Sequence, residues 1–148
     1  MKDLNIKIAI VVSEFNSKIT SELLDGALKT LLQSGFVESQ IKVVNVPGAV
    51  EIPFTAKLLA NTKLYSVVIA LGAIIRGDTD HYDYVCQQVS YGCQKVMLDL
   101  AIPIIFGVLT TKNFKQAYNR ISYQKEHKGV EAAQAAIKML DVIGSLNT

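Results

Sequence analysis

The sequence predicts an α/β protein, a three-layer sandwich in which a four-stranded parallel sheet is flanked by helices. Along its 148 residues, short aliphatic runs alternate with longer stretches whose apolar residues recur at helical spacing. One run, residues 67–71, is purely aliphatic, which is typical of a strand covered on both faces. Alternation of this kind implies parallel strands joined by right-handed helical crossovers.

The first elements follow from local patterns. Residues 6–12 read Ile-Lys-Ile-Ala-Ile-Val-Val, an apolar run that enters a core. Residues 17–34 carry a wide apolar stripe at helical spacing, and Gly35 stands where a helix ends. Residues 41–46 form the second predicted strand, which Pro47 and the glycine after it bring to an end.

The later elements continue the alternation. Residues 51–61 predict a second helix, in which Pro53 is tolerated because it falls in the first turn. Residues 81–100 predict a long third helix, and residues 102–109 a fourth strand. Two closing helices are predicted at residues 113–121 and 130–143.

Composition limits the class of protein. Fifteen basic and 13 acidic side chains give a net charge of +2, so nucleic acid is not expected as the main partner. Half of the residues are hydrophobic and 19% are charged, which excludes a disordered chain. No signal peptide is recognised, and no apolar stretch reaches the ~20 residues of a membrane span. We therefore expect a single domain over residues 1–148, in the cytoplasm and without a membrane partner.

The two cysteines, Cys86 and Cys93, are separated by two helical turns, ~10 Å, too far for a disulfide bond. They are interpreted as small core residues on one helical stripe. The sequence also lacks a dinucleotide or phosphate-loop glycine motif, paired zinc-binding cysteines and a Gly-x-Ser-x-Gly elbow. Dinucleotide binding, ATP hydrolysis, zinc chemistry and serine hydrolysis are therefore not expected.

In such folds, ligands bind beyond the carboxyl ends of the strands. The segment from Gly72 to His81 follows the third strand and precedes the long helix, whose positive end and free N–H groups favour an anion. Thr79 adds a hydroxyl, whereas Asp78 and Asp80 oppose an anion unless they turn away. The alternative is an ordinary turn with Asp or Thr as the helix N-cap.

Three other residues at these ends also have an ordinary structural interpretation. His81 could transfer protons near neutral pH, or only cap or pack the helix. Phe15 could stack on a flat heterocycle, or be a buried core aromatic. Glu51 could be only a favourable charge at a helix start.

A basic cluster lies near the end of the chain's fourth predicted helix. Arg120, Lys125 and Lys128 form a solvated face by default, although Arg120 could hold a phosphate bidentately. His127 lies in the polar segment Gln-Lys-Glu-His-Lys and is expected to be solvated.

Taken together, these segments closely resemble the 6,7-dimethyl-8-ribityllumazine synthase family, from about Lys7 to Met139. The resemblance is specific because the motifs keep their order and spacing across four strand ends. They are Phe15-Asn16, Pro-Gly-Ala-Val-Glu-Ile-Pro at 47–53, residues 72–82, Phe-Gly-Val-Leu-Thr at 106–110, Gln116-Ala117 with Arg120, and Lys-Gly-Val-Glu-Ala-Ala at 128–133.

The resemblance implies a flavodoxin-like sandwich and an enzyme. It would join 5-amino-6-ribitylaminouracil to 3,4-dihydroxy-2-butanone 4-phosphate, releasing phosphate and water, in the penultimate step of riboflavin biosynthesis. The family needs no metal or organic cofactor. Its two partners in the reaction are small molecules.

The resemblance also implies roles for individual residues. His81 would transfer protons, and Phe15 would stack on the pyrimidine ring. The ribityl chain and heterocycle would be held by Ala49, Val50, Glu51, Ile74 and Ile75. Phosphate would bind at Gly77, Asp78 and Thr79, chiefly through backbone N–H groups. A neighbouring subunit would supply Phe106, Arg120 and Lys128, with Arg120 on the phosphate.

The implied assembly is a homopentamer with its active sites between subunits, and some members build a sixty-subunit shell. Here the segment before the first strand is short, the loop at 122–127 lacks the usual glycines, and His127 replaces a common asparagine, so a free pentamer is expected. Val50 stands where a larger apolar residue is frequent, and Ser13-Glu14 is a less typical pair.

Three other functions stay open. An archaeal-type riboflavin synthase has a related scaffold, but Phe15-Asn16 and Arg76-Gly77-Asp78-Thr79-x-His81 favour lumazine synthase. A flavin- or lumazine-binding protein or shell without appreciable turnover is a second alternative, which His81 and Arg120 argue against. A flavodoxin-like binding module is the third.

Overall fold

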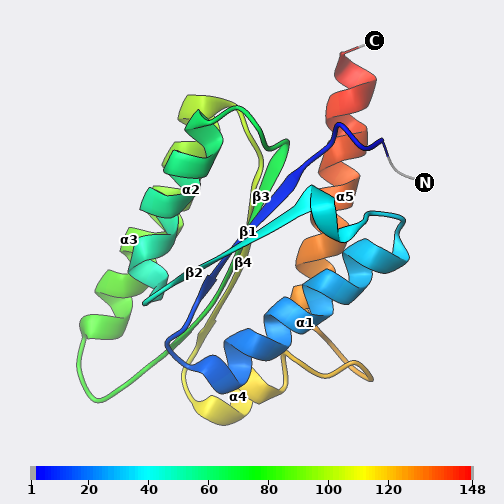
Figure 1. Ribbon diagram of the computed structural model, residues 1–148. Coiled ribbons are helices and arrows are strands. Elements are labelled where there is room, and N and C mark those ends of the chain that lie inside the picture. The colour runs from blue at the N-terminus through cyan, green and yellow to red at the C-terminus, as the bar shows by residue number, and fades with distance from the viewer. Residues whose placement is uncertain (1–2, 148) are drawn as a thin grey trace.

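The computed structural model describes residues 3–147 and confirms the predicted fold class (Figure 1). One all-parallel sheet has the strand order β2-β1-β3-β4. Its strands are β1 (Ile8–Ser13), β2 (Ile41–Val46), β3 (Val67–Ile75) and β4 (Ile104–Thr111). The α-helices are α1 (Ser17–Gln33), α2 (Ile52–Asn61), α3 (His81–Leu100), α4 (Phe114–Tyr118) and α5 (Lys128–Leu146), with short 3₁₀ turns η1 (Glu38–Gln40) and η2 (Ala49–Glu51).

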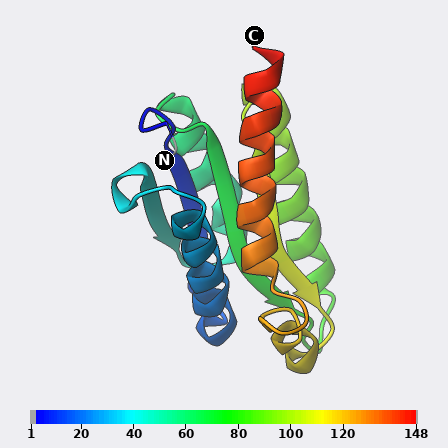
Figure 2. The ribbon, with the colours of Figure 1, turned by 90° about the vertical axis from the view of Figure 1, so that its right-hand side faces the viewer.

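Helices cover both faces of the sheet, which is why its central strands are aliphatic throughout. In β1, Ile8 and Ile10 pack into the core under α1 and α5, and Ala9 and Val11 into the core under α2 and α3. Figures 1 and 2 show these two helical layers, α1 with α5 and α2 with α3, on opposite sides of the sheet. A strand buried on both faces needs apolar residues at every position.

Several predicted boundaries differ from the observed ones. β3 does not end at Leu71 but continues to Ile75, because Ile74 and Ile75 pair with Thr110 and Thr111 of β4. Gly72, which looked like the end of this strand, lies within it. The first strand is shifted to Ile8–Ser13, the fourth to Ile104–Thr111, α4 is shorter than expected, and α5 extends to both sides of residues 130–143.

The predicted helix signals are confirmed where they concern backbone geometry. Gly35 has a φ of 101° directly after the C-cap of α1, a conformation that favours glycine. Pro53 lies in the first turn of α2. Both cysteines of α3 are free; Cys93 is buried and Cys86 half-buried in the same core, as the stripe predicted.

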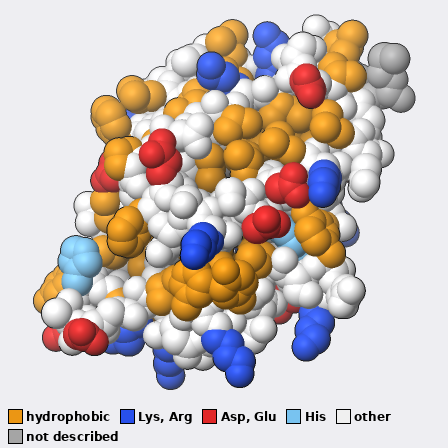
Figure 3. Space-filling view, turned by 60° about the horizontal axis from the view of Figure 1, so that its bottom comes forward, with side chains coloured by type: hydrophobic (Ala, Val, Ile, Leu, Met, Phe, Trp, Pro, Cys, Tyr) orange, Lys and Arg blue, Asp and Glu red, His pale blue; other side chains and the backbone are white. Residues whose placement is uncertain are grey.

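The carboxyl ends of the four strands lie at one end of the molecule, the lower end in Figure 1. Figure 3 looks towards this end and shows hydrophobic side chains gathered between charged residues of both signs. No helix in the described part of the chain is both long and apolar enough to cross a membrane.

Candidate functional site

A cavity of about 440 Å³ opens beyond the carboxyl ends of β1, β2 and β3. We call it the β1–β3 pocket. It brings together eight of the predicted site residues: Phe15, Ala49, Val50, Ile74, Ile75, Gly77, Thr79 and His81. Two predicted residues, Glu51 and Asp78, are not in its lining.

Phe15 reaches the pocket because the chain turns sharply after β1. Its side chain is 72% exposed, so the alternative of a buried core aromatic is wrong. Phe15 N–H donates to the carbonyl of Pro47 (3.0 Å), and the side-chain amide of Asn16 donates to the carbonyl of Ala73 (2.8 Å). Asn16 has a left-handed backbone, with a φ of 62°. An exposed ring held by both neighbouring strand ends can stack on a flat ligand.

The turn after β2 forms another wall of the pocket. Glu51 turns its carboxylate back on this turn, where Oε1 accepts the N–H of Gly48 at 2.9 Å. Gly48, Ala49 and Val50 line the pocket, and the Glu51 carboxylate binds the first of these three residues. Glu51 therefore fixes the backbone of η2 through a hydrogen bond, a more specific role than that of a favourable charge at a helix start.

The loop between β3 and α3 is exposed from residue 76 to residue 80. A Cβ added to Gly77 would meet nothing within 4 Å, so its backbone is open to a ligand. Asp80 is the N-cap of α3 but makes no side-chain capping bond, and Thr79 Oγ1 accepts the N–H of His81 only at 3.3 Å. The first N–H groups of a 20-residue helix are thus weakly satisfied by side chains, which favours an anion here.

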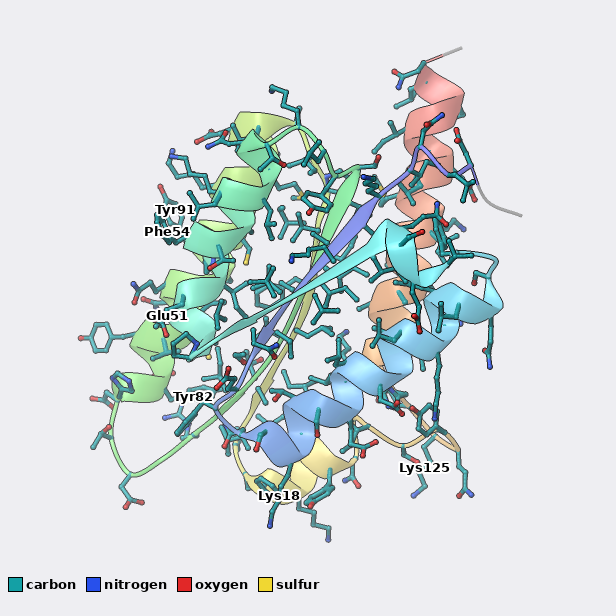
Figure 4. The ribbon with its side chains drawn as sticks, in the orientation of Figure 1. Lys18, Glu51, Phe54, Tyr82, Tyr91 and Lys125 are labelled. Carbon is teal, nitrogen blue, oxygen red and sulfur yellow. The ribbon has the colours of Figure 1, made fainter. Side chains whose placement is uncertain are left out.

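Arg76 connects the two ends of this loop. Its guanidinium is 2.9 Å from the carboxylate of Asp83 and 4.6 Å from the ring centre of Tyr82. Burial, then the thiol of Cys86, raises the pKa of Tyr82, whereas Thr110 and Arg76 act in the opposite direction. Tyr82 lies at the same end of the sheet as Glu51 (Figure 4). The ion pair with Arg76 neutralises the carboxylate of Asp83 near the proposed anion site.

A second cavity, of about 550 Å³, lies along β4. We call it the β4 pocket. It contains the other three predicted site residues, Phe106, Arg120 and Lys128, and none of these lines the β1–β3 pocket. Arg120 is not free, because its Nη1 donates to Oε2 of Glu126 in an ion pair. Lys125, the third member of the predicted basic cluster, lies in the loop between α4 and α5 and does not line the β4 pocket (Figure 4).

The prediction of a solvated His127 is wrong, because this side chain is only 5% exposed. Its Nδ1 accepts the N–H of Val130 and caps α5, and its ring lies 4.3 Å from that of Tyr123. Burial lowers the pKa of His127, while Glu22, Asp25 and Glu131 act in the opposite direction. Polar neighbours in the sequence concealed this burial, since the contact surface comes from α1.

Sequence reasoning missed several lining residues of the β1–β3 pocket. Tyr84, Val85 and Gln88 follow His81 at the helical spacing i+3, i+4 and i+7, so one face of α3 contributes all four. That spacing was available in the sequence as a signal. Glu126 of the β4 pocket was also missed, because its pairing depends on the tertiary path of the loop. Within residues 3–147, no group of three or more His, Cys, Asp or Glu is arranged to hold a metal ion.

The fold and the two pockets define an α/β protein that presents an exposed aromatic ring, an open helix N-terminus and a histidine at the carboxyl ends of a parallel sheet. Comparison with known proteins makes this class specific. The model of the 6,7-dimethyl-8-ribityllumazine synthase family matches residues 5–143. The chain belongs to this family.

Curated relatives agree with the match. Proteins of Coxiella burnetii strains CbuG_Q212 and RSA 493, both named 6,7-dimethyl-8-ribityllumazine synthase, are 52% identical to the chain over 143 residues. The match covers 97% of this chain and 95% of each relative. The protein of strain Dugway 5J108-111, with the same name, is 51% identical over the same length. The chain is therefore an enzyme, a transferase of riboflavin biosynthesis.

Proposed function

We propose that the protein condenses 5-amino-6-ribitylaminouracil with 3,4-dihydroxy-2-butanone 4-phosphate to form 6,7-dimethyl-8-ribityllumazine, the penultimate step of riboflavin biosynthesis. The observation that supports this most directly is the β1–β3 pocket, where an exposed Phe15, the open Gly77 backbone and His81 share one cavity. A flat ring and a phosphate are the two ligand features that such a lining can hold together.

Each group has a proposed role. Phe15 stacks on the pyrimidine, and Ala49, Val50, Ile74 and Ile75 enclose the heterocycle and the ribityl chain. One carboxylate oxygen of Glu51 binds the N–H of Gly48, and the other accepts hydrogen bonds from hydroxyl groups of the ribityl chain. Backbone N–H groups at residues 77–79 hold the phosphate, with the side chain of Asp78 directed away from the pocket.

The reaction requires the enzyme mainly to orient the two substrates, because they are reactive without chemical activation. The uracil amine attacks the ketone and water leaves, giving an imine; phosphate then departs as a proton is lost from carbon. The resulting enol tautomerises to a ketone, and the second nitrogen closes the ring with loss of another water. His81 transfers protons in these steps, for which acid–base help of ~10²–10⁴ in rate is typical. Proximity in the pocket supplies much of the remaining acceleration.

We further propose that the complete site lies between two subunits of a homopentamer. Phe106, Arg120 and Lys128 line a pocket separate from that of His81 within one chain, which supports a site assembled from the β1–β3 pocket of one subunit and the β4 pocket of the next. The assembly we propose is a free pentamer in the cytoplasm, with a larger assembly of pentamers as the alternative.

The test is to follow lumazine formation by absorbance after mixing both substrates with purified protein. A protein-free reaction is the necessary blank because these substrates also condense without a catalyst. We expect a rate well above the blank, reduced by inorganic phosphate, and a raised KM for the phosphate substrate in Arg120→Ala. A rate equal to the blank, together with tight flavin binding, would instead identify a binding protein.

A further inference from the structure

The ion pair in the β4 pocket places a carboxylate on the guanidinium assigned above to the substrate phosphate. Arg120 and Glu126 both line this pocket together with Lys128. Their side chains are 49% and 40% exposed, so a ligand can reach the pair from solvent. Any anion that approaches Arg120 therefore meets the negative charge of Glu126 as well.

A short hairpin fixes the backbone on both sides of this pair. Lys128 N–H donates to the carbonyl of Arg120 (2.8 Å), and Ser122 N–H donates to the carbonyl of Glu126 (2.9 Å). Between these bonds, Ile121 and His127 form an antiparallel bridge. Arg120, Glu126 and Lys128 consequently project from the same narrow piece of chain.

Contacts with α1 hold the hairpin in place. The hydroxyl of Tyr123 donates to Oδ2 of Asp25 at 3.1 Å, and the buried ring of His127 packs where a Cβ on Gly26 would collide with it. With its backbone held, Glu126 can leave Arg120 only by rotating its side chain. The carboxylate therefore stays within reach of whatever Arg120 binds.

We propose that Glu126 determines phosphate affinity in this enzyme: it competes with phosphate for Arg120 and so weakens phosphate binding and favours release of inorganic phosphate. This inference rests on the proposed function, in which Arg120 holds the phosphate. An exposed ion pair adds little to folding stability, so the main effect of this one falls on approaching anions. The guanidinium has donors enough for both groups, so the competition is electrostatic: a carboxylate beside a phosphate dianion repels it.

The test is calorimetric titration of the assembled enzyme with inorganic phosphate. Glu126→Gln removes the charge but keeps an oxygen that can accept from Arg120. We expect phosphate to bind about threefold to tenfold more tightly in this variant, an effect that added salt diminishes. Glu126→Asp, with the same charge on a shorter side chain, should give an intermediate affinity.

Glu131→Gln is the matched control. Glu131 lies in the first turn of α5, five residues after Glu126, and does not line the β4 pocket. The Glu131→Gln variant should therefore bind phosphate with the same affinity as the unchanged enzyme. Unchanged or weaker phosphate binding in Glu126→Gln would overturn the proposal. So would an equal gain in Glu131→Gln, because the effect would then reflect total charge.

The double variant separates this proposal from the proposed function. If Arg120→Ala weakens phosphate binding and Glu126→Gln no longer tightens it in that background, Glu126 acts through Arg120. If Arg120→Ala leaves phosphate binding unchanged, the proposed role of Arg120 fails and this inference fails with it. If Arg120→Ala weakens binding while Glu126→Gln alone has no effect, only the present inference fails.

Discussion

His127 shows how one buried titratable side chain makes stability depend on pH. Its imidazole caps α5 through Nδ1, while Nε2 is buried without a hydrogen-bond partner within the described residues. Burial lowers the pKa of the folded side chain below its ordinary value of 6.5. The unfolded chain therefore binds a proton first as the pH falls, so folding stability decreases below about pH 6.5 and is fully present above it.

We predict that His127→Asn removes this pH dependence. Asparagine can still accept the N–H of Val130 as a helix cap, but it does not titrate. Urea unfolding at pH 7.5 and pH 5.5 should show the original protein losing at most about 1.4 kcal/mol per pH unit through this residue. The variant should lose less over the same interval.

His81→Gln serves as the control for that measurement, because His81 is exposed and makes no buried cap. It should retain the pH dependence of the original protein. Equal pH dependence in the His127→Asn variant and the original protein would show that His127 does not cause the loss. The pKa of Asp25 is lowered, first by its hydrogen bond with Lys29, so this carboxylate changes folding stability only in a more acidic range.

Residue environments divide into those that a linear pattern can predict and those that it cannot. The free cysteines and Gly35 depend on local spacing and backbone conformation, and both predictions are confirmed. Phe15 and His127 depend on which distant segment covers them. The apolar Phe15 proved exposed, and His127, in a polar segment, proved buried against α1.

At the scale of elements, α1 and α5 approach so closely that glycine is needed between them. A Cβ on Gly129 would collide with the backbone carbonyl of Leu23. Backbone cannot rotate aside as a flexible side chain can, so the helices themselves would have to separate. Gly144 lies in the same helix, and nothing lies within 4 Å of a Cβ added there.

We predict opposite effects for alanine at these two positions. Gly129→Ala should destabilise the protein by about 1–3 kcal/mol through overpacking. Gly144→Ala should stabilise it by up to about 1 kcal/mol, because alanine is the better helix former. Urea unfolding of both variants measures the difference, and equal stabilities would contradict the close packing of α1 on α5.

The number and type of elements were predictable because each strand and helix has its own periodicity. The ends were less predictable, since pairing with a neighbour decides them. β3 extends past Gly72 because β4 continues beside it to Thr111. The local sequence of residues 67–71 gives no sign of this pairing. The same extension places Ile74 and Ile75 in the lining of the β1–β3 pocket.

At the scale of the whole molecule, the chain carries both the β1–β3 pocket and the β4 pocket and, in our proposal, half of each of two active sites. The sequence motifs identified both sets of residues through the family resemblance. The resemblance also implied that the second set belongs to a neighbouring subunit. Spacing alone could not predict this separation, because it depends on where the strand order β2-β1-β3-β4 places β4. If neighbouring subunits share the site, mixing two variants has a consequence that is not expected for a site within one chain.

Two inactive variants with complementary defects should restore activity when they assemble together. One variant carries Phe15→Ala and His81→Ala in the β1–β3 pocket, and the other carries Arg120→Ala and Lys128→Ala in the β4 pocket. With sites between subunits, random mixing in equal amounts leaves roughly a quarter of the sites with both halves intact. Co-expression with two different affinity tags, followed by sequential purification, isolates the mixed assemblies.

The lumazine assay then compares the mixed assembly with each variant alone. We expect the mixed assembly to be clearly faster than either parent and to recover the KM of the original enzyme, since its intact sites are unmodified. A chain that completes its own site would give only the average of the two parent rates, whatever the mixing ratio. Varying the ratio adds a second check, because shared sites give maximal activity at equal amounts and decline towards both extremes.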